Sequence, residues 1–221
     1  MNNTQLNYQA CTRKPDTNVT GSPSTPGRHV GEKTTIRYAL FDCWMGWLLA
    51  AETEHGVCAI LPGDDPDALV ENLGSRFPTA KMIRGDAAFD SRMFPVIKLA
   101  ESPSLGLALP LDIRGTDFQQ RVWSEVRKIP PGVTVACREI AIRIGQPTAA
   151  RAVAGACRAN PLAIAVSCHR VVGADGGLCG YRWGLWRKAE LLRREREANL
   201  VDIDAAQAIG KDAVVSSPMK S

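Results

Sequence analysis

Paired cysteine motifs and long apolar runs are both missing from this sequence of 221 residues. It holds seven cysteines, but no two form the C-x-x-C pair that is typical of zinc ribbons and zinc fingers. We therefore expect no metal site and no other cofactor. No stretch approaches the roughly 20 apolar residues of a membrane-spanning helix, and none near the start resembles a signal peptide. These absences predict a cytoplasmic protein, without a membrane partner, whose thiols stay reduced.

The excess of one sign of charge over the other is small as well. The sequence has 27 Lys and Arg residues against 23 Asp and Glu residues, which gives a net charge of +4. So small an excess neither requires nor excludes a nucleic-acid partner, and the positions of the basic residues decide the matter. Because 45% of the residues are hydrophobic and 23% are charged, the composition is that of a globular chain with a core. A wholly disordered chain is excluded.

The first part of the sequence predicts a leader and then a small domain of mixed α and β structure. Residues 1–35 are polar and rich in Asn, Thr, Ser, Gly and Pro, which predicts a disordered leader. Short apolar runs separated by turn residues follow from Ile36, and they predict a three-stranded antiparallel sheet. Helical spacing of apolar residues then predicts two helices, over about 65–76 and 86–100. The domain spans residues 36–111.

A second domain, over residues 112–198, begins with a strong helix signal. Thr116 followed by Gln119 is a capping-box pattern, in which each side chain satisfies a backbone N–H group at the start of a helix. The last predicted helix covers about 185–198 and has Leu and Ala on one face. We expect residues 199–221 to be a flexible tail.

Two short helices in this domain, over about 138–144 and 148–159, are joined by a turn at Gly145, as in a helix-turn-helix unit. The second helix carries a row of very small residues, so its backbone can approach a partner closely. Such a helix fits the minor groove of DNA, which is only about 6 Å wide. In the alternative interpretation, the row packs against another helix and the nearby Arg side chains are solvated. The row and these Arg residues are Ala152, Gly155, Ala156, Ala159, Arg151 and Arg158.

An adjacent cysteine and histidine, Cys168 and His169, interrupt an apolar run near the end of this domain. A thiolate is a strong nucleophile, and a neighbouring His can lower the pKa of a thiol. Consecutive side chains of an extended segment point to opposite faces, so a water or a sharp bend would have to couple the two. A carboxylate would be needed to orient the imidazole. The pair fits either a reactive site or a buried, inert cysteine.

Several motifs, in the right order and spacing, resemble those of the O6-alkylguanine-DNA alkyltransferase family over about residues 36–197. The most specific is the family signature Pro-Cys-His-Arg-Val, which reads Ser-Cys-His-Arg-Val at 167–171. The other motifs are Arg151-Ala152-Val153, Asn160-Pro161, Gly180-Tyr181-Arg182-Trp183-Gly184 and Leu191-Leu192-x-x-Glu195.

This resemblance implies an α+β fold. An N-terminal ribonuclease-H-like domain, with a three-stranded antiparallel sheet and helices, precedes a winged-helix-like domain that binds DNA and accepts an alkyl group. Family members repair DNA by direct reversal. They flip the damaged base out and transfer its alkyl group, irreversibly and stoichiometrically, from O6 of guanine (and O4 of thymine) to a cysteine. The implied protein is a methylated-DNA–protein-cysteine methyltransferase, a monomer whose partner is double-stranded DNA containing O6-alkylguanine.

The resemblance also implies roles for single residues. Cys168 is the alkyl acceptor, and His169 is the base that generates its thiolate through a water. Glu195 orients His169, and Asn160 ties the DNA-binding helix to the active-site strand. Arg151 fills the gap that the flipped base leaves. The other implied residues contact DNA (Ala152, Gly155, Ala156, Arg158 and Cys137) or line the base pocket (Val171, Tyr181 and Arg182).

Two positions depart from the family pattern. Ser167 stands where the family has Pro, which leaves the approach to Cys168 less constrained. Cys137 stands where the family has a Tyr whose hydroxyl donates to the guanine. A thiol is a smaller group and a weaker donor, so we expect slower transfer than in other members.

Two rival functions stay open. The first is an alkyltransferase-like damage sensor, which binds O6-alkylguanine DNA with little or no transfer. The presence of Cys168, His169, Asn160 and Glu195 argues against it. The two departures at Ser167 and Cys137 keep it open. The second is an unrelated cysteine hydrolase, which would need an oxyanion hole at Gly176 and Gly177.

Overall fold

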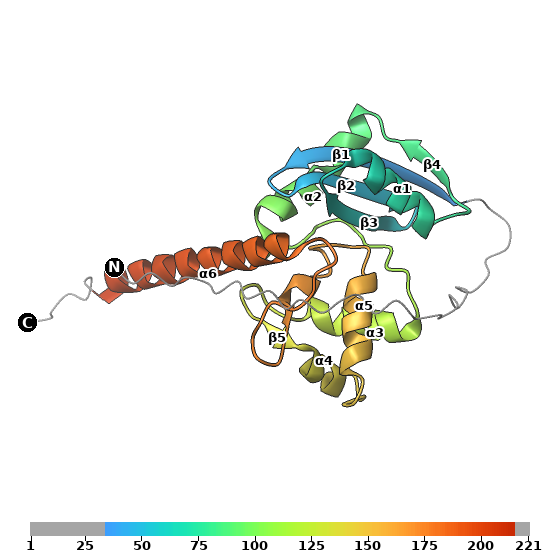
Figure 1. Ribbon diagram of the computed structural model, residues 1–221. Helices are drawn as coiled ribbons and strands as arrows, with labels where there is room; N and C mark the ends of the chain where they lie inside the picture. The colour runs from blue at the N-terminus through green and yellow to red at the C-terminus, as the bar shows by residue number, and fades with distance from the viewer. Residues whose placement is uncertain (1–33, 215–221) are drawn as a thin grey trace, which may run out of the picture. The chain divides into compact units, whose positions relative to one another are not determined.

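The computed structural model describes residues 34–214 (Figure 1). The predicted leader, residues 1–35, therefore lies almost wholly outside the described residues, as do residues 215–221 of the predicted tail. Side chains are described as far as Leu200.

A meander of three antiparallel strands forms most of the first sheet, as predicted. The strands are β1 (Thr35–Cys43), β2 (Gly46–Thr53) and β3 (Gly56–Gly63). Both hairpin turns end in a glycine with positive φ: φ is 82° at Gly46 and 138° at Gly56. Residues with a Cβ rarely adopt these angles. These tight turns set the register, with Phe41 opposite Leu48 and Ala50 opposite Ile60.

The prediction of three strands was wrong by one. A short strand, β4 (Lys81–Arg84), pairs in parallel with β1, so the sheet has the order β3-β2-β1-β4. Its four residues are exposed or half-buried. An edge strand that buries so little has no clear alternation of apolar and polar residues, which is why the sequence pattern missed it.

Two helices cover this sheet, close to the predicted positions. Helix α1 (Pro66–Arg76) and helix α2 (Ala87–Glu101) each begin after an Asp whose carboxylate accepts from the first turn. Helix α1 contacts β2 and β3, and α2 contacts β1 and β2. A 3-10 turn, η1 (Pro103–Leu105), follows. The helices contribute Leu69, Leu73, Phe89, Met93 and Val96 to the core.

The second part of the chain contains the predicted helix pair. Helix α3 (Asp117–Arg127) starts with the predicted capping box at Thr116. Helices α4 (Cys137–Arg143) and α5 (Ala150–Ala159) follow and pack against each other. Two short strands of two residues each form a small parallel sheet: β5 (Val135–Ala136) and β6 (Val171–Val172). The winged-helix assignment and the boundary between residues 111 and 112 stay predictions.

The last helix is longer than predicted. Helix α6 spans Leu185–Val214, whereas the sequence pattern ended it near residue 198 and assigned 199–221 to a flexible tail. This segment is rich in Ala, a strong helix former, and its first Pro is Pro218. It therefore holds no Pro before Val214, and the helix continues through its one glycine, Gly210.

The segment that carries the candidate site lies beside strand β3. The backbone N–H of Ile60 donates to the Pro161 carbonyl at 2.8 Å, and the Ala163 N–H donates to the Ile60 carbonyl at 3.0 Å. Nearby, the Val57 N–H donates to Pro110 at 2.8 Å. The first sheet thus holds the chain that leads from α5 to Cys168.

Candidate active site

Cys168 and His169 lie in a tight turn rather than in the extended segment that the sequence pattern suggested. The turn is η2 (Cys168–Arg170), a 3-10 turn. It follows two three-residue turns, in which Ala165 donates to Ala163 and Cys168 donates to Val166, each at 2.7 Å. Ile164 has a φ of 68°, which is strained for a β-branched residue. The bend replaces the extended backbone, in which the side chains of Cys168 and His169 would point to opposite faces.

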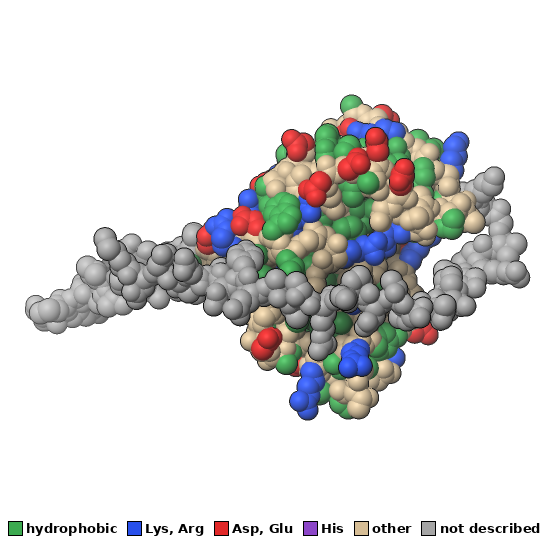
Figure 2. All heavy atoms as spheres, in the orientation of Figure 1, with side chains coloured by type: hydrophobic (Ala, Val, Ile, Leu, Met, Phe, Trp, Pro, Cys, Tyr) green, Lys and Arg blue, Asp and Glu red, His purple; other side chains and the backbone are tan. Residues whose placement is uncertain are grey.

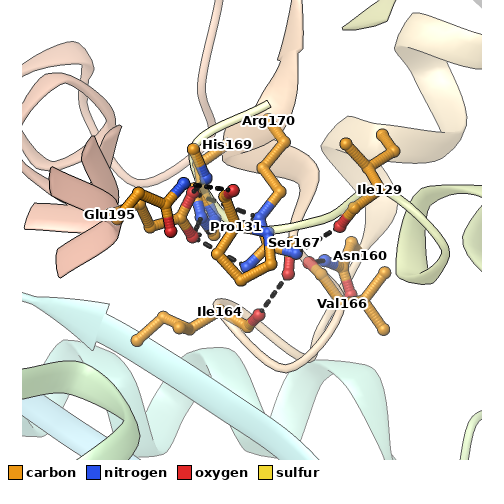
Figure 3. A network of polar contacts seen from close by, with 11 residues as sticks. Ile129, Pro131, Asn160, Ile164, Val166, Ser167, His169, Arg170 and Glu195 are labelled. Atoms are coloured by element: carbon orange, nitrogen blue, oxygen red, sulfur yellow. Dashed lines mark hydrogen bonds and ion pairs between the residues drawn. The ribbon is translucent and has the colours of Figure 1, made fainter. Parts of the chain in front are cut away.

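The imidazole of His169 is held at one nitrogen and free at the other. Its Nε2 lies 2.7 Å from Oε1 of Glu195, and both side chains are fully buried (Figure 3). Nδ1 has no hydrogen-bond partner within the described residues. Burial lowers the pKa of His169, although Glu195 opposes the shift. A neutral ring that donates from Nε2 leaves a lone pair on Nδ1, so Nδ1 can take a proton.

Glu195 stays ionised because other groups also donate to it. Arg170 Nη2 lies 2.8 Å from Oε1, and the Gly132 N–H donates to Oε2 at 3.0 Å. Arg170 also donates from Nη1 to the Ile129 carbonyl at 2.5 Å. Burial alone would raise the pKa of Glu195, but the hydrogen bonds from His169 and Arg170 bring it to about 2. Sequence reasoning missed Arg170 as part of this network, although it lies inside the signature motif.

Asn160 connects the end of α5 to the active-site turn. Its Nδ2 donates to the Val166 carbonyl at 2.9 Å and lies 3.4 Å from the Cys168 Sγ, while its Oδ1 accepts from Leu162 at 2.8 Å. The side chain is 2% exposed, so each of these groups would otherwise be buried and unpaired. The structure thus brings together Cys168 and Asn160, and His169 and Glu195, as the resemblance implies.

The thiol of Cys168 has two neighbours that sequence reasoning did not select. Cys157, one turn before Asn160 on α5, is half-buried, and interaction with Cys168 lowers its pKa. The same interaction and burial raise the pKa of Cys168 well above its usual value. The second neighbour is Lys188, a buried residue of α6 whose Nζ donates to the Val171 carbonyl at 2.6 Å and to the Leu178 carbonyl. Its ammonium favours thiolates nearby.

The implied pocket residues differ in exposure. The Tyr181 hydroxyl is buried and has no hydrogen-bond partner within the described residues, and burial raises its pKa. Val171 is buried, and its carbonyl is already bonded to Lys188. Arg182 is exposed, and its Nη1 lies 3.4 Å from the Arg158 carbonyl at the end of α5. Of these three pocket residues in the described part of the chain, Tyr181 is the one with an unused buried polar side-chain group.

Helix α5 exposes two of the four small residues of the predicted row and both of its Arg residues. Arg151, Ala152, Gly155 and Arg158 are exposed, and a Cβ at Gly155 would meet nothing within 4 Å. Ala156 is the correction. It is 4% exposed, and its carbonyl accepts from Trp123 Nε1 of α3 at 2.9 Å. It therefore packs inward, as the alternative interpretation of the row held, and is not part of the exposed face.

Cys137 is the first residue of α4 and follows β5 directly. It is half-buried, and burial raises its pKa. The strand before it pairs with Val171 and Val172, so the backbone carries Cys137 close to the end of the active-site turn.

The described part of the chain has neither a cluster of metal-ligating residues nor a membrane-spanning helix. There, no group of three or more His, Cys, Asp or Glu residues could hold a metal ion. Among the helices of residues 34–214, none is both long and apolar enough to cross a bilayer.

The site consists of a buried Cys, His and Glu beside a helix-turn-helix. This combination defines a class of α+β proteins in which a DNA-binding unit carries a cysteine site. Comparisons identify the family. The DNA-binding domain of 6-O-methylguanine DNA methyltransferase matches residues 117–197. An inducible methylated-DNA–protein-cysteine methyltransferase of Bacillus subtilis is 34% identical over 170 residues, which cover 76% of this chain and 94% of that protein. The chain belongs to the 6-O-methylguanine DNA methyltransferase family.

Other relatives are longer, and solved structures share the fold. The bifunctional transcriptional activator and DNA repair enzyme Ada of Escherichia coli is 51% identical over 185 residues, which cover 84% of this chain and 52% of Ada. The chain thus spans about half the length of that relative. A Mycobacterium tuberculosis protein, OGT, in a crystal structure with DNA, is 34% identical with a TM-score of 0.59; the match covers 74% of this chain and 93% of that one.

The active-site turn allows one prediction about stability. Ser167 has a φ of −74°, which a proline can adopt, and its hydroxyl donates to the Ile164 carbonyl at 3.0 Å. Ser167→Ala should lower the free energy of unfolding by about 1 kcal/mol through loss of this bond. Ser167→Pro should then be roughly 0.4–1 kcal/mol more stable than Ser167→Ala, because proline restricts the unfolded chain. Urea denaturation measures both, and a proline variant below the alanine variant would refute the argument.

Proposed function

We propose that this protein repairs alkylated DNA by direct reversal. The alkyl group leaves O6 of guanine, or O4 of thymine, and binds irreversibly to the Cys168 Sγ, so each molecule acts once. The protein acts as a monomer in the cytoplasm, on double-stranded DNA that contains the alkylated base. The observation that carries the proposal is the buried chain of contacts from Glu195 to His169, directly beside a cysteine held by Asn160.

The proposed chemistry begins with removal of the thiol proton. Nδ1 of His169, the free nitrogen, takes this proton from Cys168 through a bridging water, while Glu195 holds the ring and stabilises its charged form. The thiolate attacks the alkyl carbon. The carbon–oxygen bond breaks, the carbon–sulfur bond forms, and the proton returns to guanine at N1. Lys188 and the Asn160 amide favour the thiolate.

The proposed DNA contact uses the exposed face of α5. A base inside the stack cannot reach a buried thiol, so it must be flipped out, at a cost of a few kcal/mol. A small-faced helix in the minor groove and an inserted Arg151 would hold the distorted duplex. Figure 2 shows Lys and Arg side chains on the surface that α4 and α5 form. On α3, α4 and α5, the exposed basic residues without a carboxylate partner among the described residues are Arg121, Arg127, Arg138, Arg151 and Arg158.

The direct test is mass spectrometry after incubation with a duplex that contains O6-methylguanine. We expect one methyl group per protein, on the peptide that carries Cys168. Tight binding of the duplex without any adduct would instead support the damage sensor, and hydrolysis of an activated ester that depends on Cys168 would support the hydrolase.

The cysteine at position 137 leads to the prediction that a tyrosine there would speed up methyl transfer. Cys137→Tyr should raise the single-turnover rate of methyl transfer, by up to about 10²-fold, because it restores a hydroxyl donor at the reacting base. Cys137→Phe is the matched control, since it supplies the ring without the hydroxyl. If both variants transfer at the wild-type rate, the loss of a donor does not limit this protein.

A further inference from the structure

Two arginines from distant parts of the chain meet at the C-terminal end of α5. Arg76 is the last residue of α1, and its Nη1 lies 3.4 Å from the Ala159 carbonyl. Arg182 precedes α6, and its Nη1 lies 3.4 Å from the Arg158 carbonyl. Because the two carbonyls belong to consecutive residues, both guanidinium groups converge on the same helix end.

The positive charge of this pair is not balanced by a carboxylate. Within the described residues, the hydrogen bonds of Arg76 go to the Ala159 carbonyl and to Oδ1 of Asn72, at 2.8 Å, and its Nη2 is buried without a partner. Arg182 is exposed. Burial and the charge of Arg182 lower the pKa of Arg76 to about 10. A guanidinium has five N–H donors, so the carbonyls of α5 leave most of these donors free for an anion.

We propose that Arg182 and Arg76 form a binding site for one phosphate of the DNA backbone, at the end of α5. The exposed Arg182 makes the direct contacts, and the half-buried Arg76 adds its charge and its free Nη2 behind it. Phosphate oxygens match the planar donor array of a guanidinium. The choice of DNA as the source of the phosphate rests on the proposed function.

The position of the pair fits a backbone contact. Helix α5 has 10 residues, which makes it about 15 Å long, whereas the minor groove is only about 6 Å wide. The end of a helix that crosses this groove therefore reaches a flanking strand. Figure 2 shows Lys and Arg side chains gathered between α1 and α5. Because Arg76 belongs to α1, the site brings the part of the chain that carries the first sheet into contact with DNA.

The test measures binding of the full-length protein to a short undamaged duplex by fluorescence anisotropy, so that the base pocket takes no part. In a series of duplexes, one phosphate at a time is replaced by an uncharged methylphosphonate. Wild type should lose about 10-fold in affinity at one particular phosphate. Arg182→Gln should lose about as much on the unmodified duplex and no longer respond to that replacement. Its affinity should also depend less steeply on salt, by about 0.9 in the logarithmic slope.

Arg76 and a matched arginine complete the design. Arg76→Gln should lose less affinity than Arg182→Gln, and the double variant should lose less than both single losses combined, because one phosphate accounts for both. The control is Arg84→Gln, since Arg84 is an arginine of β4 that already pairs with Asp90 at 2.7 Å. It should bind every duplex as wild type does. The result for the exposed Arg182 decides the proposal if Arg76→Gln does not fold.

Two outcomes would overturn the proposal. One is wild-type affinity in Arg182→Gln. The other is a loss of affinity in this variant together with an unchanged response to every methylphosphonate, which would mean an indirect structural effect. A protein that shows the expected coupling but takes up no methyl group from an O6-methylguanine duplex keeps the phosphate site and loses the proposed function. Methyl uptake without the coupling removes the phosphate site alone.

Discussion

Replacement of Cys168 by serine is expected to abolish methyl transfer, by on the order of 10⁴-fold or more. A serine hydroxyl has nearly the same position and size, but it does not ionise as a thiol does and is a far weaker nucleophile. Nothing in the site compensates for this, because His169 is neutral and Lys188 only modestly favours an anion. Single-turnover transfer from a labelled O6-methylguanine duplex measures the effect.

Two controls separate lost chemistry from lost structure. Cys168→Ser should still bind the same duplex in a mobility-shift assay, since the exposed face of α5 is unchanged. Cys43→Ser should transfer at the wild-type rate, because Cys43 lies at the end of β1 and takes no part in the hydrogen bonds of Cys168 or His169. Full uptake of methyl by Cys168→Ser would mean that a different residue, such as Cys157 or Cys137, is the acceptor.

Much of this fold follows from local pattern. The meander, the capping box at Thr116 and the helix pair around Gly145 each have short-range signals, so a single sequence predicts them. Strand β4 has no such signal, because pairing with β1 stabilises it and it buries little of its own surface. The burial of Ala156 also depends on a distant partner, Trp123, which helical spacing cannot reveal.

The candidate site divides in the same way. Cys168 and His169 are recognisable from an unusual dipeptide in an apolar run, and the family signature selects Asn160 and Glu195. The grouping of Arg170 with Glu195 depends instead on a bend and on the path of α6, which join positions 25 residues apart. Tertiary contacts of this kind leave no periodic trace in the sequence.

Glu195→Gln is expected to damage both stability and transfer. The amide keeps the shape but loses the charge, which leaves Arg170 as a buried cation without its carboxylate; such losses cost about 3–5 kcal/mol. The amide also presents an N–H donor where His169, Arg170 and Gly132 all donate. We expect the transfer rate to fall by roughly 10²–10⁴-fold, because His169 loses the group that fixes its tautomer.

The loss of unfolding free energy in Glu195→Gln should depend on pH in one direction. The pKa of Glu195 is about 2 in the folded protein against an ordinary value of 4.5. A depressed pKa contributes stability that is fully present above 4.5 and is lost as pH falls toward 2. The gap in free energy of unfolding between wild type and Glu195→Gln should therefore be constant near neutral pH and shrink below pH 4.5. Urea denaturation at several pH values measures it, and a gap that widens in acid would refute this assignment.

A second variant distinguishes the two roles of Glu195. Arg170→Met combined with Glu195→Gln removes both charges, so no buried cation remains, and it should recover part of the stability that Glu195→Gln loses. It should not recover transfer, because His169 still lacks a carboxylate at Nε2. If the double variant regains transfer together with stability, the carboxylate acts on repair only through the fold. If stability returns and transfer does not, Glu195 orients the base that activates Cys168.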